Sequence, residues 1–326
     1  MNPRLQSATL ALLGAAALAA PALAQDYPAH PVTIVVPFSA GGPSDTVARV
    51  IAHAMGREMG QQVLVQNVGG AGGTLGAAQV ANAAPDGYNL LVHHIAMAVS
   101  DALYANLLFS PTKDFTPIGL ATDAPMVITG RPGLAADSIG ELLELIRAEG
   151  ADMTIAHGGI GGAAHLCGML LQEALGVEMV TIPYQGTGPA MTDLMGDQVD
   201  VMCDQATTTV SPIRNGSIKA YAVTSDERID SLPDLPTTAE ADLAAVRIGV
   251  WHGLYGPAGM EEAVVSRLET ALQAAIRDPE VIARLADIGT VPMPVDDATP
   301  EALRAMLDRQ IALWEPIIER AGVFAQ

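Results

Sequence analysis

Residues Val32–Asp45 read VTIVVPFSAGGPSD. The apolar, β-branched run Val32–Val36 shows no polar alternation, which is typical of a strand buried on both faces. Pro37 cannot donate to a sheet ladder, so the strand, predicted over residues 32–37, should end there. Gly41 and Gly42 then allow the backbone to turn and to approach a ligand closely.

A helix is predicted to follow this turn over residues 45–59, with Ser44 or Asp45 as its N-cap. The free N–H groups and the positive end of the helix dipole would face whatever lies at the turn. The pattern therefore indicates an anion site, although a tight turn that binds nothing fits it equally well. Because carboxylates repel anions, we expect Asp45 to shape the loop rather than to contact a ligand.

The start of the chain has the pattern of a secretory signal peptide. Arg4 supplies a positive charge, residues 10–18 are apolar, and Ala22-Leu-Ala24 fits a cleavage site. We therefore expect cleavage near Ala24 and export to the periplasm. No later stretch is apolar enough over a sufficient length to span a bilayer, so we expect a soluble protein.

Composition limits the classes of function. About 300 mature residues, half of them hydrophobic, suit two α/β domains. The formal net charge is −20, and Lys113 and Lys219 are the only lysines. This balance argues against nucleic acid and anionic membrane surfaces as partners. Any anion site must therefore be built from local donors.

The two cysteines leave two interpretations open. Cys167 lies in an apolar helical run and Cys203 at the end of a predicted strand. An oxidising compartment would permit a disulfide between them. We expect two buried free thiols instead, because both positions are apolar.

Strands and helices alternate along most of the chain, which predicts an α/β fold with parallel sheets and right-handed crossovers. The predicted strands are residues 32–37, 62–67, 89–93, 117–122, 125–130, 153–156, 178–182, 199–203, 218–224 and 247–254. The predicted helices are residues 45–59, 74–83, 138–149, 163–175, 187–195, 261–277, 279–288 and 299–320.

Small and polar residues follow six of the predicted strands. These turns are residues 38–42, 67–74, 93–94, 157–162, 183–188 and 204–205. In open parallel sheets, ligands bind at the carboxyl ends of the strands. The separation of the turns into an early and a later group predicts two domains that face one cleft.

Short motifs in a fixed order cover nearly the whole mature chain. They include Val35-Val-Pro-Phe-x-x-Gly-Gly-x-x-Asp45, Gly70-Ala-Gly-Gly73, Ala84-Pro-Asp-Gly-Tyr88, Pro183-Tyr-x-Gly186, Gln198-Val-Asp-Val-Met202 and Leu232-Pro-Asp-x-Pro236-Thr. With this set, the chain resembles the Bug-type periplasmic solute-binding proteins of tripartite tricarboxylate transporters.

The resemblance implies a two-lobed Venus-flytrap fold, each lobe a mainly parallel sheet flanked by helices. We expect residues 25–125 with 248–326 to form lobe 1 and residues 126–247 to form lobe 2, after a signal peptide over residues 1–24. It also implies a monomer that binds a small organic carboxylate, without cofactor or catalysis. The protein would deliver this ligand to integral membrane subunits of the transporter.

The resemblance further implies that loops 38–45 and 183–188 hold one ligand carboxylate from opposite lobes, partly through water. Backbone N–H groups of residues 39–42 and 186–188 are expected to be donors. The predicted ligand-binding residues are Phe38, Ser39, Ala40, Gly41, Gly42, Ser44, Gly73, Thr74, His93, His94, His157, Gly161, Tyr184, Gly186, Thr187, Gly188 and Asp204.

Three histidines depart from the family pattern. His93, His94 and His157 stand where small Ser, Thr or Gly residues are expected, and each could be structural or bind ligand. As ligand contacts they would weaken binding as the pH rises from about 5.5 to 8. Gln205 stands where Asn or Ser is commoner. The ligand could thus be a C4–C6 dicarboxylate, citrate or an aromatic dicarboxylate.

The main alternative is an exported hydrolase that uses His157 with Ser39 or Ser44. The segment His157-Gly-Gly-Ile-Gly161 is similar to an esterase oxyanion-hole motif, but the chain has no G-x-S-x-G elbow. Gly70–Gly76 has the wrong glycine spacing for a dinucleotide fingerprint, and no histidines have the H-E-x-x-H spacing of a metal site. We therefore expect neither a metal nor a cofactor.

Overall fold

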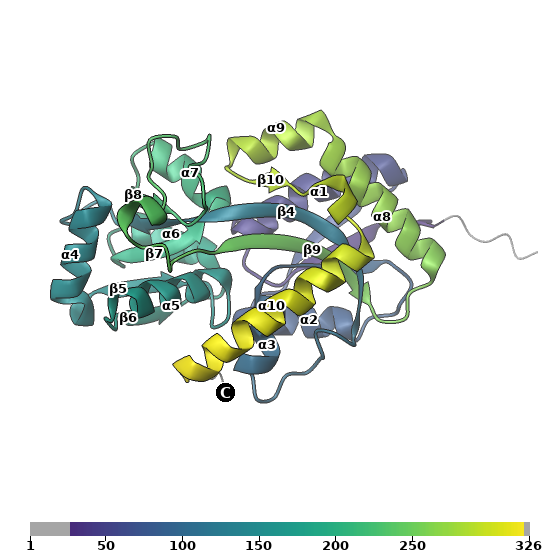
Figure 1. The fold of residues 1–326 in the computed structure, drawn as a ribbon. Helices are drawn as coiled ribbons and strands as arrows, with labels where there is room; N and C mark the ends of the chain where they lie inside the picture. Colours follow the sequence, from purple (N-terminus) through teal and green to yellow (C-terminus); the bar gives the residue numbers. More distant parts are fainter. Residues whose placement is uncertain (1–26, 323–326) are drawn as a thin grey trace, which may run out of the picture.

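The computed structural model describes residues 27–322, which form two lobes side by side (Figure 1). The predicted signal peptide and its cleavage site near Ala24 lie outside the described residues. None of the described helices combines the length and the apolar character needed to cross a membrane.

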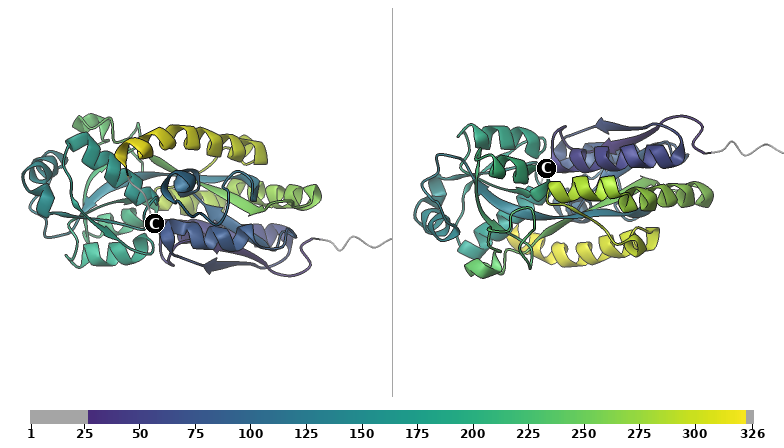
Figure 2. Two further views of the ribbon diagram at one scale, coloured as in Figure 1. Left: turned by 90° about the horizontal axis from the view of Figure 1, so that it is seen from below. Right: turned by 90° about the horizontal axis from the view of Figure 1, so that it is seen from above.

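The first lobe is built around three parallel strands. Its elements are β1 (Val32–Val36), α1 (Pro43–Met59), β2 (Val63–Asn67), α2 (Thr74–Ala81), β3 (Asn89–His93), α3 (Ala96–Leu103), α8 (Glu262–Arg277), α9 (Pro279–Asp287), β10 (Val291–Pro292) and α10 (Pro300–Ala321). Helices cover both faces of the sheet, as the views in Figure 2 show.

The second lobe repeats this construction. Its elements are α4 (Ile139–Glu149), β5 (Thr154–His157), α5 (Ala163–Leu175), β6 (Val180–Pro183), α6 (Thr187–Met195), β7 (Val201–Gln205), α7 (Ala206–Arg214) and β8 (Lys219–Val223). Two longer strands, β4 (Phe115–Gly130) and β9 (Gly249–Pro257), run between the lobes (Figure 1).

The strand order is β2-β1-β3-β9-β4-β7-β5-β6. The outer strands of each lobe pair in parallel, whereas β9 and β4 run antiparallel to their neighbours. Residues 115–125 of β4 pair with β9, and residues 126–130 pair with β7 and β8. One continuous strand therefore belongs to the hydrogen-bonded sheet of both lobes.

Strand β1 is buried on both faces, as the sequence predicts. The side chains of Val32, Ile34 and Val36 pack into one apolar cluster with α1 and α8, and Val35 packs into a second cluster on the opposite face. All four side chains are fully buried. Burial of each contributes roughly 1.5–3 kcal/mol, so β1 is a fixed support for the turn that follows it.

Several elements differ from the predicted ones. The strands predicted over residues 117–122 and 125–130 are one strand, because Pro125 lies where β4 changes partners and needs no ladder donor there. Helix α7 was not predicted, because its three threonines and Pro212 disfavour a helix. Helix α3 was not predicted either, because most of its residues are buried and no polar face marks a helical repeat in its sequence.

Cys167 of α5 and Cys203 of β7 form a disulfide, with their Cα atoms 6.0 Å apart. The expectation of two free thiols is therefore wrong, although both side chains are fully buried, as predicted. Helix α5 packs directly on β7 and brings the two residues together across a sequence separation of 36. This long-range packing is invisible in the local composition around each cysteine.

Replacing both Cys167 and Cys203 by alanine should lower the free energy of unfolding by about 3–4 kcal/mol, because the unfolded chain loses a covalent loop closure. Urea denaturation of both proteins measures this difference. Reductant should destabilise the wild type and leave the double variant unchanged. Two reactive thiols in the denatured, unreduced wild type would contradict the bridge.

Candidate functional site

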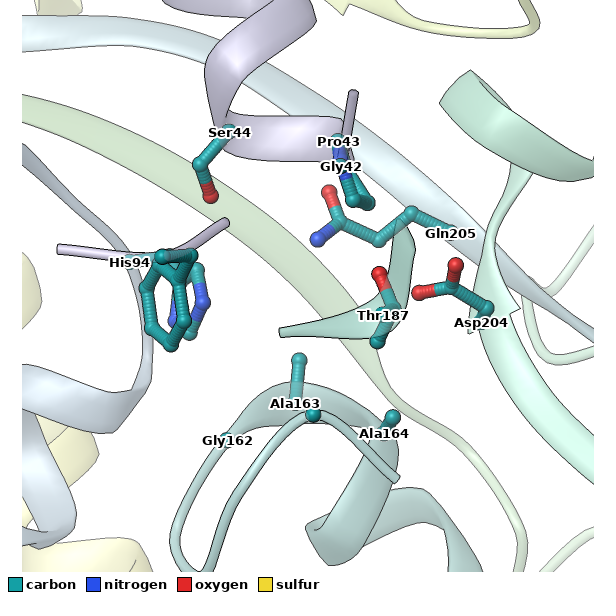
Figure 3. Close-up of a pocket in the computed structure, with 12 residues that line it drawn as sticks. Gly42, Pro43, Ser44, His94, Gly162, Ala163, Ala164, Thr187, Asp204 and Gln205 are labelled. Carbon is teal, nitrogen blue, oxygen red and sulfur yellow. The ribbon is translucent and has the colours of Figure 1, made fainter. Parts of the chain in front are cut away.

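Four helices begin at one small pocket between the lobes (Figure 3). They are α1 of the first lobe and α5, α6 and α7 of the second. The residues that line the pocket are Phe38, Gly42, Pro43, Ser44, His94, Gly158, Gly162, Ala163, Ala164, Thr187, Asp204 and Gln205. Because each helix start presents free N–H groups and positive potential, the pocket favours an anion.

These helix starts have no side-chain caps. Gly42, Gly162 and Gly186 are the N-cap residues of α1, α5 and α6, and Gln205 is that of α7; none of them makes a side-chain cap hydrogen bond. A serine or aspartate at these positions would accept from the first-turn N–H groups. Without such caps, the N–H groups stay available to a ligand.

Asp45 supports the first of these turns, as the sequence predicts. Its carboxylate accepts hydrogen bonds from the backbone N–H of Gly41 at 2.9 Å and from the side chains of Asn67 and Arg49 at 3.0 Å each. Burial opposes ionisation of this group, but the bonds from Arg49, Gly41 and Asn67 outweigh it and lower the pKa of Asp45. Asp45 thus remains charged and holds the loop in shape.

Three polar side-chain atoms around the cleft are buried without a hydrogen-bond partner in the described part of the chain. They are Ser39 Oγ from the first lobe, and Thr187 Oγ1 and Gln205 Oε1 from the second. Each buried unpaired polar group costs about 1–3 kcal/mol. Because native proteins rarely tolerate such groups, their gathering at one cleft indicates a place where a polar ligand or water binds.

The two lobes touch each other around this pocket. The N–H of Ser39 donates to the carbonyl of Gln185 at 3.2 Å, and the hydroxyl of Tyr104 donates to the carbonyl of Ile160 at 2.9 Å. The pocket leaves about 20 Å³ for the centre of a water molecule, which is room for about one water. The lobes are therefore closed, and they must part before a ligand of several carbon atoms can enter.

The histidines that the sequence singled out are all buried, and backbone N–H groups fix their tautomers. The N–H of the next residue donates to His93 Nδ1 at 2.9 Å, that of Ala96 donates to His94 Nδ1 at 3.1 Å, and that of Gly159 donates to His157 Nδ1 at 3.1 Å. The ring proton of each neutral histidine therefore lies on Nε2. Only His94 lines the pocket, where its ring stacks on Phe38 with centroids 4.6 Å apart.

Burial lowers the pKa of His93 to about 3 and that of His157 to about 4, and it holds the pKa of His94 well below its usual value. All three rings are neutral between pH 5.5 and 8. Their titration therefore cannot weaken ligand binding over this range. The expectation that binding weakens as the pH rises from about 5.5 to 8 is corrected accordingly. His94 can still offer an uncharged Nε2–H donor to the pocket.

The pocket brings together six of the predicted ligand-binding residues, which are Phe38, Gly42, Ser44, His94, Thr187 and Asp204. The other predicted residues do not line it: Ser39, Ala40, Gly41, Gly73, Thr74, His93, His157, Gly161, Tyr184, Gly186 and Gly188. The hydroxyl of Tyr184 donates to Asp193 at 2.6 Å, and that of Thr74 donates to the carbonyl of Ala71 at 2.9 Å.

The expected backbone donors of the first turn are engaged within the protein. Gly41 N–H donates to Asp45, as described above, and Gly42 N–H donates weakly to the Ser39 carbonyl at 3.4 Å. In this closed arrangement, the free N–H groups that follow Pro43 at the start of α1 face the pocket instead of those of Gly41 and Gly42.

Sequence reasoning missed half of the lining. The additional residues are Pro43, Gly158, Gly162, Ala163, Ala164 and Gln205. Gly158 and Gly162 lie in a turn that the sequence marked, and Gln205 was noted as a departure. Ala163 and Ala164 carry no polar side chain, so only the start of α5 could have indicated them.

Residues 47–323 match a family described as the tripartite tricarboxylate transporter family receptor. The chain belongs to this family. A relative from Agrobacterium vitis, described as a UPF0065 protein in the TAR-I ttuE-ttuC' intergenic region, is 47% identical over 312 residues, covering 95% of this chain and 90% of that protein. The predicted resemblance to Bug-type receptors is confirmed.

Solved structures show the same fold. The periplasmic binding protein BugD has a TM-score of 0.90 at 46% identity, covering 92% of this receptor and all of BugD. MatC from Rhodopseudomonas palustris with bound malate has a TM-score of 0.86 at 37% identity, with 90% and 100% coverage. An R. palustris protein with adipate has a TM-score of 0.87 at 28% identity, with 92% and 99% coverage.

Receptors of this class bind solutes and are not enzymes, and the structure does not pair Ser44 with His157 as the hydrolase alternative requires. Ser44 Oγ lies 3.3 Å from His252 Nε2 rather than beside His157, and His252 Nδ1 lies 3.1 Å from Thr122 Oγ1. Both ring nitrogens of His252 thus face hydroxyls. Burial lowers its pKa to about 3, so this ring is a poor base for activating a serine.

Glycines form the contact between the closed lobes, and Gly72 is the tightest of them. It has φ +63°, and a Cβ atom there would lie 2.0 Å from the carbonyl oxygen of Ile160 in the other lobe. Gly72→Ala should therefore prevent full closure. With a saturating ligand, small-angle scattering should give a larger radius of gyration for the variant than for the wild type.

Gly176→Ala is the matched control for this test. Gly176 has φ +64°, but a Cβ atom added there would meet nothing within 4 Å. Both variants bear the backbone strain of a left-handed residue, about 1–2 kcal/mol, and only Gly72→Ala meets the opposite lobe. Equal radii for both variants would show that this contact does not limit closure.

Buried histidines should make the receptor sensitive to acid. Burial lowers the pKa of His93, His94, His157, His165 and His252 in the folded protein. Histidines in the unfolded chain have a pKa of about 6.5, so below this pH the unfolded chain binds more protons than the folded protein. Stability is therefore complete above about pH 6.5 and falls as the pH drops toward 4. Each ring that stays neutral in the folded protein lowers the free energy of unfolding by about 1.4 kcal/mol per pH unit below that value.

Asp204 acts in the opposite direction. Burial raises its pKa to about 6, so its contribution to stability decreases as the pH rises from about 4 to 6. Burial also raises the pKa of Asp101, Asp123 and Glu269, but carboxyl groups ordinarily titrate at lower pH than the five imidazoles. The net effect between pH 8 and pH 5 is therefore loss of stability in acid. Urea midpoints measured from pH 5 to 8 check this, and a midpoint that stays constant would contradict it.

Proposed function

We propose that this receptor captures a small organic carboxylate in the periplasm and delivers it to the membrane subunits of a tripartite tricarboxylate transporter. The observation that carries the proposal is the meeting of four uncapped helix starts at one pocket. Fixed N–H donors with positive potential suit a carboxylate. They also supply the dense local donors that a chain with a net charge of −20 needs.

Side chains from both lobes would complete the site. The free hydroxyls of Ser39 and Thr187 would donate to the carboxylate from opposite sides. His94 would add its neutral Nε2–H donor, and ordered water would fill the remaining gaps. The related MatC with malate and the related protein with adipate support a dicarboxylate of four to six carbons, with citrate and aromatic dicarboxylates as alternatives.

Ligand capture would use hinge closure of two rigid lobes. We assign residues 25–125 with 248–326 to lobe 1 and residues 126–247 to lobe 2, after a signal peptide over residues 1–24. The change of partners of β4 between Pro125 and Met126 supports this boundary. A ligand bound by both lobes would stabilise the closed state of a monomer.

A thermal-shift screen of carboxylates, neutral sugars and amines tests the proposed function. A carboxylate at about 100 times its Kd should add roughly 2.7 kcal/mol to the stability of the receptor. Thr187→Val should weaken binding of that carboxylate at least tenfold, because one donor is lost. Thr181→Val is the matched control, since Thr181 is exposed on β6, and it should bind normally.

Stabilisation by sugars or amines alone would overturn the carboxylate assignment. Normal binding by Thr187→Val would instead place the carboxylate elsewhere in the cleft. Isothermal titration of the stabilising compound gives the affinities for both comparisons.

A further inference from the structure

A second cavity, which we call the hinge groove, lies between the lobes and shares no lining residue with the pocket at the helix starts. Its volume is about 580 Å³, which lies within the range of small-molecule sites, roughly 300–1,000 Å³. Both lobes and the segments that connect them line the hinge groove: Asp123, Pro125, residues 224–231, residues 247–249, Ala286 and residues 289–291.

Helix α7 separates the hinge groove from the pocket. The helix begins at the pocket, and its Ala206 and Val210 lie against Gly289 of the hinge groove, where an added Cβ atom would lie 2.8 and 3.0 Å from their side chains. One turn of the same helix is also tied to the first lobe, because the hydroxyls of Thr207 and Thr290 are hydrogen-bonded at 2.7 Å. The hinge groove is therefore a distinct site.

Both arginines of the hinge groove are already neutralised by carboxylates. The guanidinium group of Arg228 donates to the two carboxylate oxygens of Glu240 at 3.0 and 3.1 Å. The guanidinium group of Arg247 pairs with the carboxylate of Asp226. The hinge groove therefore offers no unpaired positive charge that would attract an anion.

Three other acidic residues of the hinge groove lack such a partner. Asp123, Glu227 and Asp230 form no ion pair in the part of the chain that the structure describes. Asp123 is exposed in the hinge groove, yet the surrounding protein desolvates its carboxyl group and raises its pKa. A cation placed beside this carboxylate would offset that desolvation.

A buried hydroxyl of the hinge groove also lacks a partner. Ser231 is 8% exposed, and its Oγ makes no hydrogen bond among the described residues. This oxygen lies against Gly289, where an added Cβ atom would be 2.8 Å from it. Two residues further on, Val291 pairs with Asp123 in the sheet. A buried hydroxyl without a partner is costly, and it can accept a hydrogen bond from an N–H group that a ligand supplies.

The rest of the lining shows what kind of cation would fit. Pro125, Ile229, Ile248 and Val291 contribute apolar surface, and Val291 is 55% exposed. Such surface suits an aliphatic chain. Among the described residues, no three His, Cys, Asp or Glu side chains are grouped so that they could hold a metal ion. Separate positive charges on an organic molecule therefore match these carboxylates better than one metal ion.

We propose that the hinge groove binds an organic cation with two ammonium groups on an aliphatic chain. One ammonium group pairs with Asp123 on β4, and the other pairs with Glu227 or Asp230 of the second lobe. The hydroxyl of Ser231 accepts a hydrogen bond from the cation. Because both lobes line the hinge groove, the bound cation contacts both of them and stabilises the closed arrangement. This site does not depend on the identity of the carboxylate ligand.

Isothermal titration of the full mature receptor with putrescine and cadaverine tests the site, with n-butylamine and Mg²⁺ as comparison ligands at the same ionic strength. At least one diamine should bind at a single saturable site. It should bind about tenfold more tightly than n-butylamine, because the second ammonium group adds a charge-assisted hydrogen bond. Mg²⁺ should bind more weakly than the diamine.

Asp123→Asn tests the residue, because asparagine keeps the shape of the side chain and removes its charge. The variant should bind the diamine about tenfold more weakly, and Ser231→Ala should weaken binding about threefold. Asp152→Asn is the matched control. Asp152 is exposed and lies outside the hinge groove, so its replacement changes the net charge equally and should leave binding unchanged. Far-UV circular dichroism establishes that the variants fold.

Equal weakening by Asp123→Asn and Asp152→Asn would show that the diamine responds only to the net charge of −20, and it would overturn the site. The absence of saturable binding would overturn it too, as would n-butylamine or Mg²⁺ binding as tightly as the diamines. The comparison between ligands needs only the wild type, so it remains decisive even if a variant does not fold.

Discussion

Strand β4 is the constraint on which the rest of the structure depends. Its first part is bonded to β9 and its last five residues to β7 and β8, so one backbone holds the two sheets edge to edge. The carboxyl ends of β1 and β3 in one lobe, and of β5 and β7 in the other, therefore open toward the same gap. The helix starts meet at the pocket because the strands before them are fixed in this way.

The pocket can bind an anion because these helix starts lack side-chain caps. Three of the four N-cap residues are glycines, although serine, threonine or aspartate would stabilise an isolated helix more. The free hydroxyls and amide around the pocket carry a similar cost. Local stability is thus lowered on both sides of the cleft, and a ligand that contacts both sides can recover it. This coupling favours closure around the ligand over closure around water.

Much of the fold could be predicted because β1, the glycine turns and the amphipathic helices follow local rules. Helix α7 could not, since its threonines and Pro212 favour other conformations and only packing on β4 and β7 decides for a helix. In the site, turns 38–42 and 183–188 were found from their glycines. Ala163 and Ala164 were not, because they act through the backbone. The exposure of His93, His94 and His157 depends on packing from distant segments, so their neutral state could not be predicted from sequence.

The disulfide lies directly behind the pocket. Cys203 precedes Asp204 in β7, and Cys167 lies one turn after the start of α5, whose first residues also line the pocket. The bridge thus ties two sides of the recognition surface to each other. Because such a bond persists only in an oxidising compartment, these sides are joined covalently only after the chain has reached one. The binding surface therefore reaches its final, cross-linked form only in the oxidising compartment.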